Sequence, residues 1–413
     1  MVSGLPHPIP PLITGYEKKY RLSTYFNQWW DEYVQYPQSY IYPEQYKAVR
    51  AMRACRTASL GVDHYVCDHC GEITPVYHSC KNRFCPTCSW KDTLNWADKM
   101  KDQLLPIAHR HVVFTLPHQL NGLLNRNKRT LLDFLFRSAG ETLKDWMQHK
   151  YHLTPGIISV LHTFGEKKEL HPHIHMILSW GGITAQGKIE SIKGEYVPYE
   201  FLQTKFRCKF EDKLVALYDS THLSHDFPDR ISFLRFVKTI NEKNWRIHFE
   251  PAMPIPSQVI RYIGRYSKRA CLSEYKITNI EGEYITFRYK DYKHVDYYGK
   301  PLEKELTLHY REFYPRLLQH VPLPYFRLVR YYGTYAARTK AVLAPQMQVS
   351  SQSESHQAPV DAFDQSNNPL ICQVCHCEKT YLHTTFESPT GEISYMSRFA
   401  PKEQYEKHKQ IIA

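Results

Sequence analysis

Two cysteine pairs restrict the fold of this chain more than any other feature of its sequence. Cys67 and Cys70 form one C-x-x-C pair, Cys85 and Cys88 form a second, and 14 residues lie between the pairs. Each pair can present two thiolates from one tight turn, and four thiolates in a tetrahedron are the usual ligands of a structural zinc ion. Redox-active or inert buried thiols are the alternative. We predict one zinc site made by these four cysteines.

Composition indicates a globular protein of two or three domains. The chain has 413 residues, of which 42% are hydrophobic and 23% charged, as in ordinary folded proteins. No apolar run approaches the ~18 residues of a membrane span, and the start lacks a cationic signal-peptide region. We therefore expect a cytoplasmic protein with no membrane partner, where clustered cysteines favour metal binding over disulfides.

Positive charge is concentrated in one part of the chain. The net charge is +12, and residues 255–340 contribute +8 of it, from 16 basic and 8 acidic residues, together with 14 of the 31 tyrosines. Cations interleaved with aromatic rings suit a phosphate backbone and stacked bases, which favours single-stranded nucleic acid as the partner. A well-solvated basic surface is the alternative.

Hydrophobic periodicity predicts both helices and strands, and therefore an α+β fold. The expected helices lie within 25–56 (two, separated by Pro37 and Pro43), 93–105, 120–151 (two), 199–218 and 257–270. The expected strands are 111–116, 157–164, 173–179, 247–249, 283–289 and 305–308.

Composition shifts suggest five segments. We expect an N-terminal arm at 1–24, a helical and zinc-binding domain at 25–100, and a larger domain at 101–345. A disordered linker rich in Gln, Ser and Asn is expected at 346–370, followed by a tail at 371–413 with a candidate metal knuckle at Cys372, Cys375 and Cys377.

The run HPHIHMIL contains a candidate metal site. His173 and His175 alternate with apolar residues in an expected strand, so both imidazoles lie on one face and can bind one divalent ion. The preceding turn, from Glu166 to Glu169, offers a carboxylate as a third ligand. Purely structural histidines beside a solvated turn are the alternative.

A second candidate site is the helix expected around YIGRYSKR. Tyr262 and Tyr266 are four residues apart and share a helix face, surrounded by Arg261, Arg265, Lys268 and Arg269. A phenol can act as a nucleophile when cations or a metal-polarised phosphate assist it. An amphipathic helix that packs both tyrosines on the core is the alternative.

Together the three motifs resemble those of rolling-circle transposases of bacterial insertion sequences, the HUH group of the IS91 type. The resemblance covers roughly residues 25–340. It is carried by CRTASLG at 55–61, SCKNRFCPTC at 79–88, HVVFTLPHQL at 111–120, LHTFGEKKELHPHIHMIL at 161–178, VIRYIGRYSKR at 259–269, FRYKDY at 287–292 and FRLVRYYG at 326–333.

The resemblance implies a fold, a mechanism and a place of action. Residues 101–345 would be the HUH catalytic domain, residues 25–100 would recognise DNA, and the protein would act at the bacterial nucleoid. HUH nucleases have a palm-like antiparallel sheet with helices on one side, and by matching positions His173 and His175 would bind Mg²⁺ or Mn²⁺. Glu166 is the expected third ligand, with His162 as its rival. Tyr262 or Tyr266 would attack the scissile phosphate of single-stranded DNA at transposon ends or target, forming a 5′-phosphotyrosine and freeing a 3′-hydroxyl. Two other functions fit the motifs: a plasmid or phage replication initiator, and a zinc-dependent DNA-binding regulator without catalysis.

Overall fold

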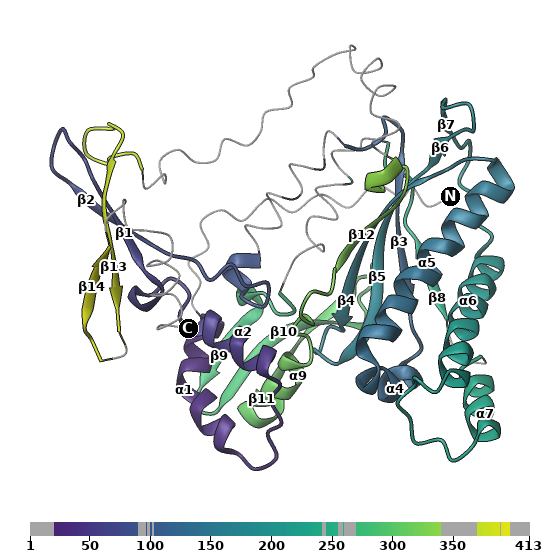
Figure 1. Cartoon of the computed structure of the whole chain (residues 1–413), viewed down its shortest axis with the longest axis horizontal. Coiled ribbons are helices and arrows are strands. Elements are labelled where there is room, and N and C mark those ends of the chain that lie inside the picture. Colours follow the sequence, from purple (N-terminus) through teal and green to yellow (C-terminus); the bar gives the residue numbers. More distant parts are fainter. Residues whose placement is uncertain are drawn as a thin grey trace.

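The computed structural model describes residues 20–89, 96, 100, 103–241, 245–254, 259, 270–339, 370–388 and 390–396. Four antiparallel sheets and the helices that pack on them make up this part of the chain (Figure 1). The predicted α+β fold class, with an antiparallel sheet and a cysteine-rich N-terminal region, is confirmed. No helix in the described ranges is both long enough and apolar enough to span a membrane.

A five-stranded antiparallel sheet occupies the middle of the chain. Its order is β12-β4-β5-β3-β8, and β4 and β5 form a hairpin in which His162 lies opposite His173 and Val160 opposite His175. Both faces of this hairpin are apolar, which indicates that both faces are covered. The strands are β3 (His109–Thr115), β4 (Gly156–Phe164), β5 (Leu170–Ser179), β8 (Arg246–Phe249) and β12 (Val329–Gly333).

Helices cover one face of this sheet. In α5, buried residues recur every three or four positions, so one helix face packs against strand side chains such as Ile174 and Met176. Figure 1 shows α5 and α6 side by side on this face. The helices are α4 (Asn121–Arg126), α5 (Lys128–Tyr151), α6 (Tyr199–Asp219) and α7 (Arg230–Asn241), and a short hairpin of β6 (Gly181–Ile183) and β7 (Ile189–Ser191) follows β5.

The opposite face of the sheet carries a smaller apolar cluster. Because strand side chains alternate, Ile158 and Val160 of β4 and Ile177 of β5 share this face with the three histidines at 162, 173 and 175. These apolar residues are buried with Val259 and Tyr335. The two faces of the hairpin therefore differ. One packs into the larger hydrophobic core, and the other carries three histidines at the end nearest the turn.

The N-terminal helices pack on a second sheet. Its order is β11-β10-β9, and its core is rich in aromatic rings; Tyr314 stacks on Phe26 with ring centroids 4.3 Å apart and donates a hydrogen bond to the Tyr25 carbonyl. The elements are α1 (Leu22–Gln35), α2 (Pro43–Arg53), η3 (Glu274–Lys276), β9 (Ile277–Glu281), β10 (Tyr284–Val295), β11 (Pro301–His309) and α9 (Tyr310–Leu318).

The two ends of the chain share the third sheet. Its order is β14-β13-β1-β2, and β1 pairs along its length with β13, from Val62 opposite Thr385 to Val66 opposite Thr380. Figure 1 shows these strands at one end of the molecule. The residues predicted as a C-terminal tail thus contribute β13 (Thr380–Glu387) and β14 (Ile393–Met396), beside β1 (Val62–Val66) and β2 (Ile73–Tyr77).

Several predicted elements are present. The two helices around Pro37 and Pro43, the strand ending before Pro117, the hairpin of β4 and β5, and the long helix at 199–218 all form. The 3₁₀ turns η1 (Ala58–Leu60) and η2 (His118–Leu120) and the strands of the terminal sheet were not predicted. Most of the arm expected at 1–24, of the helices expected at 93–105 and 257–270, and of the linker expected at 346–370 lies outside the described ranges.

Candidate functional site

Three histidines meet on the second face of the central sheet. His162 of β4 lies directly opposite His173 of β5 and diagonally opposite His175. Cross-strand neighbours on one face of a sheet lie close together, so the three imidazoles are near one another. Their ring centroids are 4.6 Å apart for His162 and His175, and 4.9 Å apart for His173 and His175. One ring nitrogen of each histidine lies within 4.8 Å of the others. Three converging imidazoles can bind one transition-metal ion.

Hydrogen bonds orient two of these imidazoles. His173 Nδ1 lies 2.7 Å from the carbonyl oxygen of His171 and donates to it, which leaves the Nε2 lone pair for a metal. His175 Nδ1 lies 2.8 Å from Nε2 of His111 on β3. If His175 held a metal through Nε2, its Nδ1–H would donate to His111. His111 would then support the site from the neighbouring strand, a role that the sequence analysis missed.

Burial keeps the histidines neutral. Desolvation, followed by repulsion from the neighbouring His162, lowers the pKa of His173 to about 3 and the pKa of His175 well below its usual value. Desolvation likewise lowers the pKa of His111 to about 3. Neutral imidazoles have free lone pairs at neutral pH, so the cluster is ready to bind a cation without first losing protons.

Glu166, the expected third ligand, is not part of this cluster. Its Oε2 accepts hydrogen bonds from Lys276 Nζ at 2.9 Å and from the Lys290 backbone N–H at 3.1 Å. Burial raises the pKa of Glu166, but these contacts outweigh burial and the net shift is downward. The structure does not place Glu166 with His173 and His175, because the carboxylate joins the turn after β4 to the second sheet. His162 is the side chain grouped with the two histidines.

We expect substitution of His111 to weaken metal binding through His175. In His111→Ala the His175 Nδ1–H loses its acceptor, and loss of such a partner typically lowers metal affinity about 10–100-fold. His111→Gln keeps an acceptor and should restore much of the affinity. Calorimetric titration with Mn²⁺, with thermal unfolding as a check on folding, measures the effect. Equal Mn²⁺ affinity in His111→Ala and the wild type would contradict this role.

The predicted nucleophiles lie outside the described residues. This holds for Tyr262 and Tyr266 and for the surrounding cations Arg261, Arg265, Lys268 and Arg269. Residues on both sides are described. Val259 is fully buried with Ile158, Val160 and Ile177 on the histidine face, and Ala270 donates its N–H to Ser89 Oγ at 3.0 Å. Ala270 and the adjacent Cys271 line a pocket that His162 also lines.

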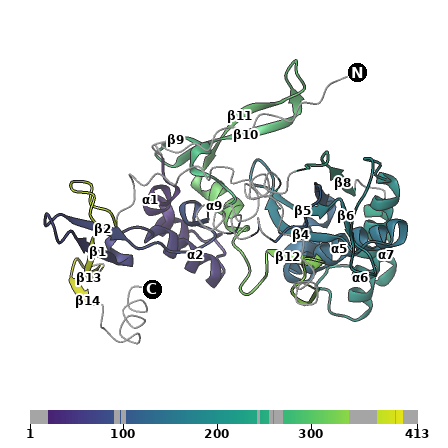
Figure 2. The ribbon, with the colours of Figure 1, turned by 90° about the horizontal axis from the view of Figure 1, so that it is seen from above.

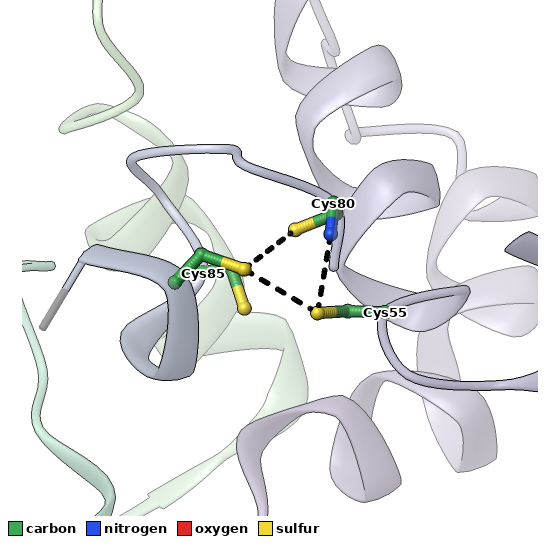
Figure 3. A group of neighbouring side chains, drawn as sticks. Cys55, Cys80 and Cys85 are labelled. Carbon is green, nitrogen blue, oxygen red and sulfur yellow. Dashed lines mark hydrogen bonds between the residues drawn. The ribbon is translucent and has the colours of Figure 1, made fainter. Parts of the chain in front are cut away.

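Four cysteines form a compact cluster beside the N-terminal helices. Sγ of Cys88 lies 3.5 Å from Sγ of Cys55 and 3.5 Å from Sγ of Cys80, and Cys85 completes the group. Figure 3 shows Cys55, which follows α2, converging with Cys80 and Cys85 of the segment that follows β2. Hydrogen bonds from Cys55 and Cys80 lower the pKa of Cys88, whereas hydrogen bonding with Cys55 raises the pKa of Cys80 and of Cys85. We call this group the inner cysteine cluster.

The other predicted zinc ligands lie in a different group. Cys67 and Cys70 meet Cys372 and Cys375, and all four ligand atoms lie within 4.8 Å of one another. We call this group the outer cysteine cluster. The prediction that the two C-x-x-C pairs share one zinc is therefore wrong, because each pair is grouped with two cysteines other than those of the second pair. Cys55 and Cys80, which the sequence analysis left unassigned, belong to the inner cluster.

Comparison with known proteins identifies the family. Residues 25–116 match the family described as a transposase zinc-binding domain, of the IS91 type, and residues 156–342 match one described as a putative transposase. A putative transposase of Sinorhizobium fredii is 31% identical over 367 residues, which cover 84% of this chain and 91% of the relative. The chain belongs to the IS91-type transposase family.

A second relative agrees with this assignment. The transposase for insertion sequence element IS801 of Pseudomonas savastanoi pv. phaseolicola is 27% identical over 350 residues, covering 81% of this chain and 82% of the relative. No solved structure matches the chain. The inner cysteine cluster of this transposase lies wholly within the matched zinc-binding domain, and the three histidines lie within the second match.

The outer cluster lies only partly within the matched regions, because Cys372 and Cys375 follow the last residue of either match, at position 342.

An IS91-type transposase acts on DNA, and the zinc-binding domain together with the inner cluster supports a structural zinc ion. The four sulfurs fit that ion, because a tetrahedron with bonds of about 2.3 Å has edges of about 3.8 Å.

Proposed function

We propose that this transposase cuts and rejoins single-stranded DNA at transposon ends by attack of a tyrosine on a phosphate held beside the three histidines. The observation that supports this most directly is the convergence of His162, His173 and His175 on the sheet face against which Val259, three residues before Tyr262, is buried. The two predicted sites, 90 residues apart in sequence, would then form one active site.

The three histidines would hold a divalent cation. A bound Mn²⁺ or Mg²⁺ would supply positive charge that polarises the scissile phosphate. Three nitrogen donors fit Mn²⁺ better than Mg²⁺, because Mg²⁺ prefers oxygen ligands and retains water. His173 is the partly exposed member, whereas His162 and His175 are buried. The cation would therefore be approached from the side of His173.

The described residues on either side of Tyr262 and Tyr266 support the proposal that these tyrosines act at the histidine site. Val259, three residues before Tyr262, is buried against the histidine face, and Ala270, four residues after Tyr266, lines a pocket beside His162. The chain on both sides of the two tyrosines therefore lies near the histidines. Either phenol could then meet a phosphate bound by the cation.

The chemistry exchanges one phosphodiester for another. The tyrosine oxygen would bond to phosphorus as the bond from phosphorus to the 3′ oxygen breaks, and the phenol proton leaves as the 3′ oxygen gains one. The products are a 5′-phosphotyrosine and a free 3′-hydroxyl, and reversal with a new 3′-hydroxyl rejoins the strand without an external energy source. A second tyrosine would allow two such ends to be held at once.

The hairpin of β10 and β11 supports a single-stranded substrate. Figure 2 shows it extending away from the helices. Tyr297 and Tyr298 at its end are 97% and 82% exposed, and Lys293 and Lys300 beside them are also exposed. Exposed aromatic rings among cations suit unpaired bases, which stack on rings while the backbone meets the charge.

The test of this function is a covalent adduct. Oligonucleotides that tile both strands around the ends of the element, labelled at the 3′ end, are incubated with the protein and Mn²⁺. A 5′-phosphotyrosine carries the 3′ label into a denaturant-resistant protein band, whereas a 5′ label leaves with the free 3′-hydroxyl. DNA binding without adduct on any oligonucleotide would contradict catalysis and favour a zinc-dependent DNA-binding regulator.

We expect Tyr262→Phe and Tyr266→Phe each to retain adduct formation and the double variant to lose it. Either phenol can supply the nucleophile, whereas phenylalanine has no oxygen to attack phosphorus. Adduct yield on the 3′-labelled substrate measures this, with exposed Tyr40→Phe as the matched control. Complete loss in one single variant would contradict the paired nucleophile and indicate one essential tyrosine.

A further inference from the structure

The outer cysteine cluster joins two turns that are about 300 residues apart in the sequence. Cys67 and Cys70 lie in the turn between β1 and β2, and Cys372 and Cys375 lie in the turn that precedes β13. Sγ of Cys67 is 3.4 Å from Sγ of Cys375, and Sγ of Cys70 is 3.4 Å from Sγ of Cys372. Both separations exceed the ~2.05 Å of a disulfide and approach the ~3.8 Å edge of a zinc–thiolate tetrahedron.

The two turns have the same backbone geometry. In the first, the Cys67 N–H donates to the carbonyl of Glu72 and the Gly71 N–H donates to the carbonyl of Cys67. In the second, the Cys372 N–H donates to the carbonyl of Cys377 and the His376 N–H donates to the carbonyl of Cys372. The residue after each second cysteine has positive φ, 76° at Gly71 and 58° at His376.

This repetition is informative because positive φ is unfavourable for a residue with a Cβ. A turn that keeps a positive φ at His376 must gain stability from the backbone shape that this φ produces. This backbone shape directs both thiols of a C-x-x-C pair toward one point. Two such turns facing each other supply four thiols, which is a complete structural zinc site rather than half of one. The first turn taken alone offers only two ligands.

We propose that Cys67, Cys70, Cys372 and Cys375 bind a second structural zinc ion, which fastens the C-terminal strands to the N-terminal zinc-binding domain. The ion displaces the four thiol protons to solvent and binds four thiolates. The pairing of β1 with β13 then lies directly beside the metal. The zinc-binding domain of this chain is therefore built from both ends of the sequence.

A buried lysine accompanies the site. The side chain of Lys379 is 0% exposed, and its Nζ lies 3.0 Å from Oε2 of Glu72, which in turn lies 2.8 Å from Sγ of Cys372. A buried ammonium needs nearby negative charge, and four thiolates around a divalent ion carry a net charge of about −2. Lys379 offsets part of that charge and also that of Glu72.

An alternative ligand set shares one thiol with this site. His69 and Cys377 lie near Cys375 and could hold an ion with it. That group has three donors, of which His69 is exposed, whereas the four-cysteine group includes the buried thiols of Cys67 and Cys372. Closed four-ligand sites are the structural kind, so the four-cysteine group is the zinc site.

Metal counting on the full chain tests the proposal. We expect about two zinc ions per chain in the wild type and about one in the Cys372→Ser/Cys375→Ser double variant. The His69→Ala/Cys377→Ser double variant should keep both ions, as should Cys208→Ser, which removes an exposed thiol outside both clusters. Equal zinc content in the wild type and the Cys372→Ser/Cys375→Ser variant overturns the proposal. If that variant does not fold, native mass spectrometry of the wild type decides, because about one bound zinc overturns the second site and about two support it.

A cleavage experiment tests the fastening itself. A protease site inserted within residues 346–368 allows the chain to be cut between the last matched residues and the second turn. The C-terminal fragment of the cut wild type should stay with the N-terminal part through gel filtration, and the fragment of the cut Cys372→Ser/Cys375→Ser variant should separate. The cut wild type and the cut variant are compared while the zinc of the inner cysteine cluster is still bound. Retention of the variant fragment would show that strand pairing alone holds it and would overturn the fastening role.

Discussion

Replacing His162 with alanine is expected to reduce formation of the covalent DNA adduct by about 10³-fold, because a divalent cation at such a site contributes several kcal/mol to transition-state stabilisation. His162 is the ligand that β4 contributes, opposite His173 and against His175. With two imidazoles left, the cation would bind weakly and out of position. Adduct formation from 3′-labelled DNA, followed across a titration of Mn²⁺, measures the loss.

Two variants control this experiment. Glu166→Gln removes the charge of a carboxylate that contacts Lys276 and Lys290, and we expect near-normal Mn²⁺ affinity and adduct yield. His149→Ala removes an exposed histidine of α5 and should change neither quantity. Loss of Mn²⁺ affinity in Glu166→Gln together with full activity in His162→Ala would show that the carboxylate, and not the imidazole, is the third ligand.

The difference between these two candidates shows what the sequence could resolve. Both flank the turn of one hairpin, and the alternation HPHIH correctly placed His173 and His175 on one face. The third ligand depends on the register between β4 and β5, which puts His162 opposite His173. A strand alternation running backward from the turn could have suggested His162. Glu166 instead forms a hydrogen bond with Lys276, which lies 110 residues further along the chain. The sequence around the hairpin does not predict that contact.

Sequence patterns within single segments predicted the helices and strands whose formation depends on residues close together in the sequence. The apolar stripe of α5 and the proline-bounded helices α1 and α2 follow from spacing within a single segment. The hairpin of β4 and β5 also follows, because its strands are joined by one short turn. These elements supply the histidine face of the candidate site.

The cysteine sites were beyond such reasoning. A C-x-x-C pair indicates a metal knuckle but does not say which other pair completes it, and the nearest pair in sequence was the natural choice. Here the partner of Cys67 lies at Cys375, brought near by the pairing of β1 with β13. Nothing in the spacing of the N-terminal cysteines encodes that contact, because it forms only when the two ends of the chain fold together.

Replacing Cys88 with serine is expected to unfold the region around the inner cluster. Cys85 and Cys88 are buried in the same core as Phe84, Trp30 and Tyr314, so this metal site lies inside the aromatic core of α1, α2 and α9. Structural zinc contributes about 10–16 kcal/mol in isolated zinc-finger peptides, against a typical domain stability of about 5–15 kcal/mol. Zinc content should fall by about one ion per chain, and the thermal transition should broaden and shift downward.

The effect should reach the active site. Ser89, next to Cys88, accepts the N–H of Ala270 at the end of the tyrosine segment, so release of the inner zinc loosens one anchor of that segment. Adduct formation should then fall together with the thermal transition in Cys88→Ser, whereas Cys208→Ser should leave both unchanged. In Cys372→Ser/Cys375→Ser the aromatic core keeps its zinc, and its thermal transition should persist. Loss of the same transition in both cluster variants would contradict this division, because it would mean that the two cysteine clusters fold as one unit.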